Sequence, residues 1–148
     1  MKRCEQLSKL SEEHQDCILL ADKIARIAKE GSDKELSEGI DIVKQYNYEA
    51  LETHLQNEEQ MIFAPLIQHH REHAELCITL GREHGVLRTI VEEISLENAK
   101  KDLADFAQLL KAHSIMEDKE PFPLIESLFT EEQLNKVLNF APRFSRYA

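Results

Sequence analysis

The sequence predicts an all-α protein, an up-and-down antiparallel four-helix bundle with a short C-terminal helix. Apolar residues recur at helical spacing in four long segments, polar stretches separate these segments, and none shows the period-two alternation of a strand. A chain of 148 residues is long enough for one ordinary core and too short for two domains. We therefore predict a single domain over 1–148, with the bundle at about 5–120 and a C-terminal extension at about 121–148.

The first two predicted helices follow from apolar stripes on either side of a polar break at 31–35. The first stripe runs through His14 and consists of Leu7, Leu10, Cys17, Ile18, Ala21, Ile24, Ala25 and Ala28. The second runs on through His54 and Glu58 and begins with Leu36, Ile40, Val43, Ala50 and Leu51. Pro65 is expected to end or kink this helix, because proline lacks an amide hydrogen and clashes with the preceding turn.

Three further helices are predicted after the polar stretch at 68–73. The third stripe consists of Cys77, Leu80, Gly81, His84, Leu87, Val91 and Ile94. After a break at 95–100, the fourth stripe continues to His113 and Glu117. It begins with Leu103, Phe106, Ala107 and Leu110. Prolines in the PFP stretch at 121–123 should stop it. Thr130 and Gln133 have capping-box spacing for a short helix carrying Leu134, Val137, Leu138 and Phe140.

Charge and composition exclude several partners. The formal net charge of −10 and the absence of a Lys/Arg cluster argue against nucleic acid as a partner. The sequence has neither an apolar run long enough to span a membrane nor a secretory signal, so a cytoplasmic location is expected. Cys4, Cys17 and Cys77 are odd in number and lack metal-ligand spacing, which favours buried or inert thiols over disulfides.

The four helices each carry a histidine on the apolar stripe, and these histidines can lie at one level. In an antiparallel bundle, two residues at the same height are equally far from the turn that joins their helices. Halfway points between the successive histidine-bearing sites fall at residues 35, 70 and between 99 and 100, within the three polar breaks. The turn positions therefore predict a single layer containing His14, His54, His84 and His113.

Two of these histidines belong to a repeated pattern. HLQNEEQMIFAP and HSIMEDKEPFP each place a glutamate four residues after a histidine, a second acid next to it, and a phenylalanine nine residues after the histidine. Residues four apart on a helix share a face, so His54 converges with Glu58 and His113 with Glu117. Four imidazoles and two buried carboxylates call for counter-charge, and a mixed set of six suits a pair of iron, manganese or zinc ions.

At these residues the chain resembles the hemerythrin-like (HHE cation-binding) family over roughly residues 8–128. The resemblance implies a four-His/two-Glu di-iron centre, with His14 and His54 on one iron and His84 and His113 on the other. Glu58 and Glu117 would bridge the two irons, together with an oxo or hydroxo group, and manganese or zinc could substitute. Leu80 and Arg88 stand where the family's oxygen carriers would need a fifth histidine, so the chain looks closer to the subfamilies linked to nitric oxide, peroxide or iron-sulfur cluster repair.

Two functions are expected from this reading. The first is a non-haem di-iron protein that binds oxygen, nitric oxide or peroxide, or that reduces it as an oxidoreductase with electrons from a protein redox partner. The alternative is a metal- or oxygen-responsive sensing or interaction module without turnover, with residues 130–148 as a docking element. A third reading is a bundle whose histidines only fill the core.

Other candidates have simpler interpretations. His69, His70 and His73 lie in a predicted turn and are expected to be solvated. Four acids adjoin the proposed ligands but point about 100° away on a helix, which favours positions in solvent or behind the ligands. These acids are Glu13, Glu59, Glu83 and Asp118. Cys17 follows His14 by about one turn and is expected to be a buried, inert thiol.

Overall fold

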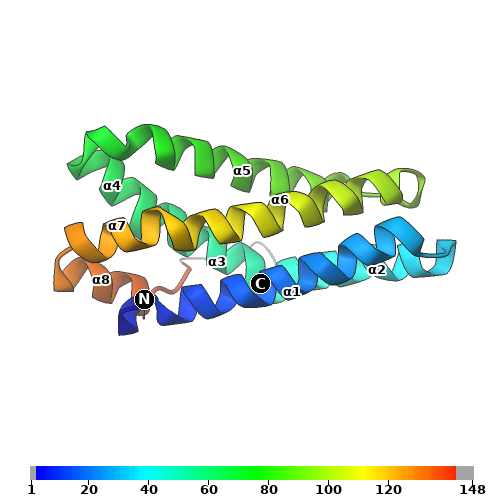
Figure 1. Ribbon diagram of the computed structural model, residues 1–148, viewed down its shortest axis with the longest axis horizontal. Coiled ribbons are helices and arrows are strands. Elements are labelled where there is room, and N and C mark those ends of the chain that lie inside the picture. The colour runs from blue at the N-terminus through cyan, green and yellow to red at the C-terminus, as the bar shows by residue number, and fades with distance from the viewer. Residues whose placement is uncertain (1–2, 143–148) are drawn as a thin grey trace.

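The computed structural model describes residues 3–142 and is helical throughout, with no strand in that range. Four long helical runs alternate in direction and pack side by side, and a short helix near the C-terminus lies across one end (Figure 1). This is the antiparallel four-helix bundle with a short C-terminal helix that the sequence predicts. No helix within residues 3–142 combines the length and apolarity needed to cross a membrane.

The first run is α1 (Glu5–Glu30), and it pairs most extensively with α6 (Ala99–Lys119). Small buried residues on the facing sides, among them Ala21, Ala28 and Ala107, allow this close approach. Gly31 and Ser32 alone separate α1 from α2 (Asp33–Tyr46). Ser32 starts α2 with a capping box, in which its hydroxyl accepts from the Glu35 amide and the Glu35 carboxylate accepts from the Ser32 amide.

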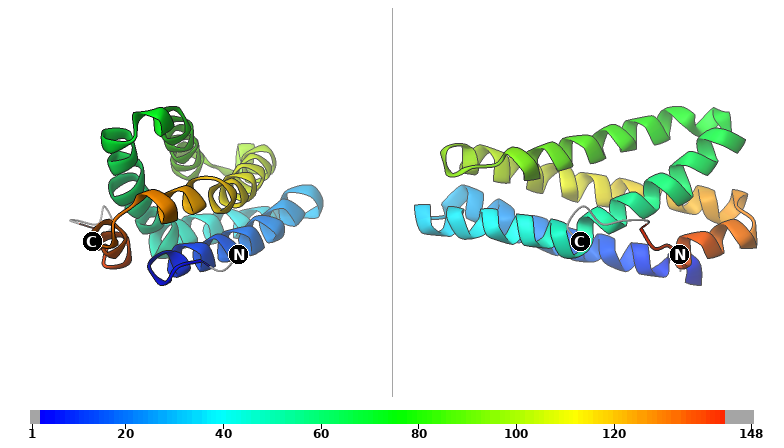
Figure 2. Two further views of the ribbon diagram at one scale, coloured as in Figure 1. Left: turned by 60° about the vertical axis from the view of Figure 1, so that its left-hand side comes forward. Right: turned by 180° about the vertical axis from the view of Figure 1, so that it is seen from behind.

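The second run continues past Pro65 instead of ending there. It passes from α2 through η1 (Asn47–Leu51), α3 (Glu52–Asn57) and η2 (Glu58–Phe63) to α4 (Ala64–His69). Both η1 and η2 are π-helical, and Pro65 stands in the first turn of α4, where a missing amide hydrogen is tolerated. The run changes direction along α3 and α4 (Figure 2). Of the two expected outcomes at Pro65, the structure therefore shows a kink.

The remaining runs bring the chain back twice. A short 3₁₀ segment, η3 (Arg71–His73), leads into α5 (Ala74–Glu93), and a second, η4 (Leu96–Asn98), leads into α6. The PFP stretch does end α6, but it also begins a helix that the sequence did not predict, α7 (Pro121–Leu128), with proline in its first turn. The predicted capping box at Thr130 is confirmed and starts α8 (Glu131–Leu138), which ends before Phe140. Residues 143–148 of the predicted extension lie outside the described range.

Two apolar layers fill the bundle, one on each side of the histidines. The layer toward the α1–α2 and α5–α6 turns includes Cys17, Ile24, Leu87, Val91, Leu103 and Phe106. The layer toward the opposite end includes Leu7, Leu10, Phe63, Leu80, Phe122 and Ile125. His14 stands between Leu10 and Cys17 along α1, and His84 between Leu80 and Leu87 along α5. The fold thus positions one polar layer between two hydrophobic ones.

Candidate metal centre

All six residues that the sequence singled out lie in this polar layer and are buried. Their exposed fractions are at most 5%, and those of Glu58, Glu117, His14 and His84 are 0%. Four different helical runs supply them: α1 carries His14, α3 and η2 carry His54 and Glu58, α5 carries His84, and α6 carries His113 and Glu117. The levelling predicted from the turn positions is therefore confirmed.

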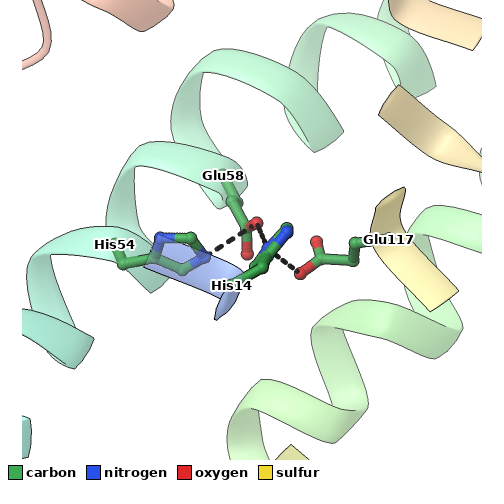
Figure 3. A group of neighbouring side chains, drawn as sticks. All are labelled: His14, His54, Glu58 and Glu117. Atoms are coloured by element: carbon green, nitrogen blue, oxygen red, sulfur yellow. Dashed lines mark hydrogen bonds and ion pairs between the residues drawn. The ribbon is translucent and has the colours of Figure 1, made fainter. Parts of the chain in front are cut away.

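The six side chains form two overlapping groups, each able to surround one cation. The first position is lined by His14 and His54, the second by His84 and His113, and both groups include Glu58 and Glu117. Within each group, the candidate ligand atoms all lie within 4.8 Å of one another. Figure 3 shows the first group, with both histidine rings directed toward the carboxylates.

The two carboxylates stand between the two positions. Glu58 directs Oε2 toward Nε2 of His54 and His14, at 3.0 and 3.2 Å, and Oε1 toward Nε2 of His84, at 3.2 Å. Glu117 Oε1 lies 2.8 Å from Nε2 of His113 and 3.1 Å from Nε2 of His14. Each glutamate thus faces histidines of both positions, as a bridging carboxylate must.

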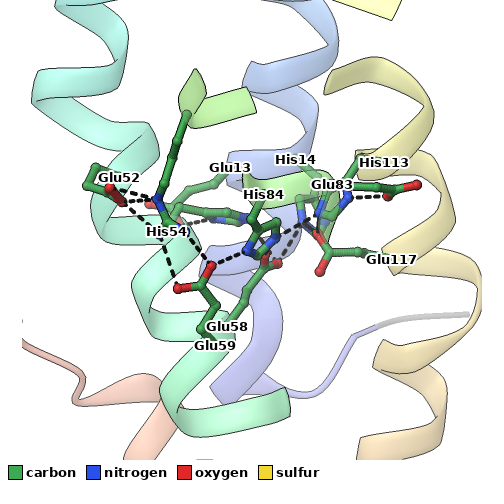
Figure 4. A network of polar contacts seen from close by, with 11 residues as sticks. Glu13, His14, Glu52, His54, Glu58, Glu59, Glu83, His84, His113 and Glu117 are labelled. Carbon is green, nitrogen blue, oxygen red and sulfur yellow. Dashed lines mark hydrogen bonds and ion pairs between the residues drawn. The ribbon is translucent and has the colours of Figure 1, made fainter. Parts of the chain in front are cut away.

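Every histidine also has an acid near its Nδ1 atom, on the side away from the centre, and Figure 4 shows the acids behind His54, His84 and His113. The Nδ1 atoms of His54, His84 and His113 lie 2.9, 2.7 and 2.6 Å from Glu13, Glu59 and Glu83, respectively. His14 Nδ1 is 3.2 Å from Asp118 Oδ1, an ion-pair distance without hydrogen-bond alignment.

These outer acids determine which ring nitrogen of a histidine is available to bind a metal ion. An ionised carboxylate can only accept hydrogen bonds, so Nδ1 carries the hydrogen and the neutral ring keeps its lone pair on Nε2. All four Nε2 atoms face the centre. All four imidazoles therefore present Nε2 to the centre, and a hydrogen bond to an outer acid fixes the metal-binding tautomer of His54, His84 and His113.

The arrangement has an approximate twofold correspondence that explains the repeated pattern. Glu13 and His14 correspond to Glu83 and His84, and His54 corresponds to His113. The contact of Glu13 with His54 thus has its counterpart in that of Glu83 with His113. The two phenylalanines of the pattern follow the same rule. The Phe122 ring lies 5.0 Å from the His14 ring, and the Phe63 ring lies 5.4 Å from the His84 ring. The repeat therefore reflects two similar half-sites, each closed by an aromatic ring.

Without a cation, the centre holds positive charge on its histidines. Burial lowers the pKa of His84, but hydrogen bonds to Glu58 and Glu59 outweigh it and raise the pKa to about 9. In the same way, burial is outweighed by Glu58 and Glu13 at His54, whose pKa rises to about 10. Burial also raises the pKa of Glu58, yet the neighbouring histidines hold it well below its ordinary value. The layer thus needs protons or metal ions to neutralise its carboxylates.

The donor set fits a pair of metal ions better than it fits a closed hydrogen-bond network. Among the described residues, Glu117 Oε2 is buried without a hydrogen-bond partner, and Glu58 Oε1 has only His84 Nε2 at 3.2 Å without good alignment, which is costly in a dry interior. His84 Nε2 and His113 Nε2 approach to 3.0 Å, although each has its hydrogen on the opposite nitrogen when neutral. Lone pairs and carboxylate oxygens that converge in this way are satisfied by cations, and His/carboxylate sets suit iron, manganese or zinc.

Other residues discussed from the sequence lie outside these two groups. His69 is exposed, and His70 and His73 are partly exposed, with only Glu72 at 3.9 and 3.7 Å as an ionic neighbour. This confirms a surface position for all three. Leu80 is buried in the apolar layer and Arg88 is bound to Glu52 and Glu59, so the third helix offers no second ligand near His84.

The three cysteines are free, and Cys17 and Cys77 are buried, as expected. Burial raises the pKa of the Cys17 thiol, and its Sγ lies 3.3 Å from the Tyr46 hydroxyl. Cys17 therefore has the raised pKa of an unreactive thiol.

The sequence alone leaves the role of the four outer acids undecided. In the structure they stand behind the histidines and keep about a quarter to a third of their side chains exposed. Their signal was adjacency, since each immediately precedes or follows a residue of the centre.

Comparison with known proteins agrees with this geometry. No curated protein and no solved structure matches the chain significantly. The hemerythrin HHE cation binding domain matches residues 5–126, which include all six residues of the centre and most of the bundle. The chain therefore belongs to the hemerythrin HHE cation-binding family.

Proposed function

We propose that the protein is a non-haem di-iron protein that binds or reduces a small oxidant, namely oxygen, nitric oxide or peroxide. The observation that carries this proposal is the pair of overlapping groups with four candidate ligands each. Metals bound by histidine and carboxylate are often six-coordinate, so four protein ligands leave positions for an external molecule. A purely structural ion would be enclosed by its ligands.

The proposed ligands are His14 and His54 at the first position, His84 and His113 at the second, and Glu58 and Glu117 between them. Iron would supply the redox chemistry at these positions, and manganese or zinc could replace it in binding. The protein's own contribution is to hold the imidazole tautomers with the outer acids and to keep bulk water away with the two apolar layers.

A small uncharged oxidant suits this setting because it can cross apolar packing that excludes ions. Electrons would come from a protein redox partner. Three free thiols fit a reducing compartment such as the cytosol. A role in stress response or in iron-sulfur cluster repair would be consistent with this chemistry.

The decisive experiment measures metal content and reactivity in the same sample. Protein loaded with ferrous iron under anaerobic conditions should contain about two irons per chain, because the centre has two positions. Mixing it with oxygen, peroxide or nitric oxide should change the iron absorption spectrum at a rate that depends on oxidant concentration. At most one tightly bound metal after reconstitution would disprove the di-nuclear proposal. Two irons that react with none of the three oxidants would favour the alternative, a metal-responsive interaction module without turnover.

A further inference from the structure

The twofold correspondence between the half-sites fails beside the second position, at Arg88 and its partner Glu52. The offset that relates His14 to His84 relates Ile18 to Arg88, and the offset that relates His54 to His113 relates Glu52 to Lys111. The second position thus has an arginine and a glutamate where the first has an isoleucine and a lysine. The two metal positions differ here although the residues that line them correspond.

Arg88 joins two carboxylates to the outer side of His84. Its Nε lies 2.9 and 3.0 Å from the two oxygens of Glu52, and its Nη2 lies 2.9 Å from Glu52 Oε2. Its Nη1 and Nη2 donate to Glu59 at 2.7 and 3.1 Å. Glu59 Oε2, the oxygen that receives Nη1, also accepts from His84 Nδ1 at 2.7 Å. Arg88 therefore holds the acceptor that orients His84.

This contact also connects two helical runs. Arg88 and His84 lie one turn apart on α5, whereas Glu52 and Glu59 lie on α3 and η2. The guanidinium is partly buried, with 25% of its side chain exposed, and Glu52 is buried. Two-pronged arginine–carboxylate pairs fix geometry as well as charge, and partial burial protects them from screening by salt. The pair holds α5 in register with η2 beside the centre.

The first position is supported differently. There the outer acid Asp118 accepts from the neutral Ser11 hydroxyl at 2.8 Å, and its contact with His14 is the longest of the four. Lys111, which corresponds to Glu52, forms an ion pair with Asp22 that is about half exposed on both sides. Packing of α1 against α6, the most extensive helix pair, positions His14 instead.

Helix α5 has less packing to rely on. It lies along one edge of the bundle and carries Gly81 and Gly85 on either side of His84, where an added Cβ would meet nothing within 4 Å (Figure 1). Glycine weakens a helix interior, and open space at both positions means that no neighbour depends on their small size. The position of His84 therefore depends more on a specific contact than that of His14.

We propose that Arg88 is a positioning residue for the second metal position, so that the two positions of the centre depend on it unequally. This inference rests on the proposed two-metal centre. Loss of Arg88 should weaken the ion held by His84 and His113 and leave the ion held by His14 and His54 nearly unchanged. The two positions have corresponding ligands, but the Glu52–Arg88–Glu59 contact would give them different affinities for a metal ion.

The test is anaerobic titration of metal-free protein with ferrous iron, read by native mass spectrometry and by equilibrium binding. For Arg88→Met, one ion should bind as in the wild type and the other about 10- to 100-fold more weakly, the range for loss of a group that supports a metal ligand. Arg88→Lys should recover only part of the loss, since an ammonium group cannot pair with both carboxylates in the same fork geometry. Lys111→Met, the matched change beside the first position, should bind two ions normally.

Double variants identify the affected position. In a His54→Ala background, which disables the first position, Arg88→Met should abolish most of the remaining binding. In a His113→Ala background it should change little. If Arg88→Met folded poorly, Glu52→Gln would break the same contact while leaving Arg88 paired with Glu59, and it should show a smaller selective loss.

Equal weakening of both ions, or no weakening, in a folded Arg88→Met protein would overturn the inference while leaving the two-metal centre intact. Wild-type protein that bound one ion would instead overturn the centre itself, and the role of Arg88 with it.

Discussion

Each histidine of this centre is held by contacts at its two ring nitrogens, Nδ1 on the outer side and Nε2 on the inner side. At His54, His84 and His113, Nδ1 donates a hydrogen bond to an outer acid, which fixes the tautomer of the ring. At all four histidines Nε2 faces Glu58 or Glu117. Glu58 and Glu117 are therefore the residues on which most contacts converge. Removing either one takes an anion from a layer that is otherwise rich in imidazole.

We expect Glu117→Ala to lose metal and to unfold at a lower temperature. The change removes a candidate bridge and leaves buried imidazoles without their partner, and breaking such buried pairs costs roughly 3 kcal/mol or more. Metal analysis and thermal melting should show both losses together. His70→Ala is the control, because His70 lies at the surface outside both groups, and an equal metal loss in this variant would contradict the site.

The metal-free protein should lose stability as the pH rises above neutrality. Burial lowers and the surrounding carboxylates raise the pKa of His84 and His54, with net values of about 9 and 10, against 6.5 in the unfolded chain. A raised folded-state pKa gives stability that is full below the unfolded value and is lost as the pH passes the folded value. The melting temperature should therefore fall between about pH 6.5 and 10.

Metal ions compete with these protons, so the apparent affinity for metal should rise over the same pH range. The melting temperature of the metal-loaded protein should lack the fall seen without metal. Melting curves measured at several pH values with and without metal test this directly. A metal-free protein that became more stable above pH 7 would show that its histidines are neutral.

At this scale, the sequence was informative about the inward residues and less so about the outer ones. Spacing of four places His54 and Glu58 on one face, and the turn positions level the four histidines, so these six could be predicted from the chain alone. That they bind metal stays a prediction. Glu13 and Glu59 were left undecided because each contacts a histidine on a different helix, and such partners depend on how the helices are rotated.

The helices themselves were largely predictable because their signals are local. Apolar stripes and polar breaks locate the four runs, and Thr130 with Gln133 marks the start of α8. The sequence does not predict the π-helical segments η1 and η2, since such short departures from α-helical hydrogen bonding leave no distinct residue pattern. The sequence does not predict helix α7 because prolines at 121 and 123 indicate the end of a helix, although proline also suits the first turn of the next one.

Two glycine substitutions should have opposite effects on the helices. Gly85→Ala should stabilise α5 by up to about 1 kcal/mol, raising the melting temperature by about 2–4 °C, because nothing obstructs the new methyl group. Gly31→Ala should destabilise the protein, since its Cβ would meet the Ile27 carbonyl oxygen at 2.5 Å in the α1–α2 turn. Thermal melting of the two metal-free variants checks both. Stabilisation by Gly31→Ala would show that this turn can shift at little cost.

In the whole molecule, the polar layer divides the core in two and joins all four helical runs. Two apolar layers lie on either side of it. Metal ions shared by ligands from four runs would act as cross-links between helices that otherwise meet through separate clusters. With metal bound, the centre would be both the proposed reactive element and a structural connection, which would link metal occupancy to the order of the bundle.

This arrangement also predicts how the iron-loaded, reduced protein should react with oxygen. A reversible carrier must restrict access to one metal and protect what is bound there, whereas here both positions have four candidate ligands, and Leu80 and Arg88 supply none beyond them. Open positions on both metals give an oxidant more than one route to accept electrons. We therefore expect the iron-loaded, reduced protein to consume oxygen irreversibly. Stopped-flow mixing with oxygenated buffer followed by deoxygenation tests this, and an oxygenated spectrum that returned fully to the reduced one would identify a carrier instead.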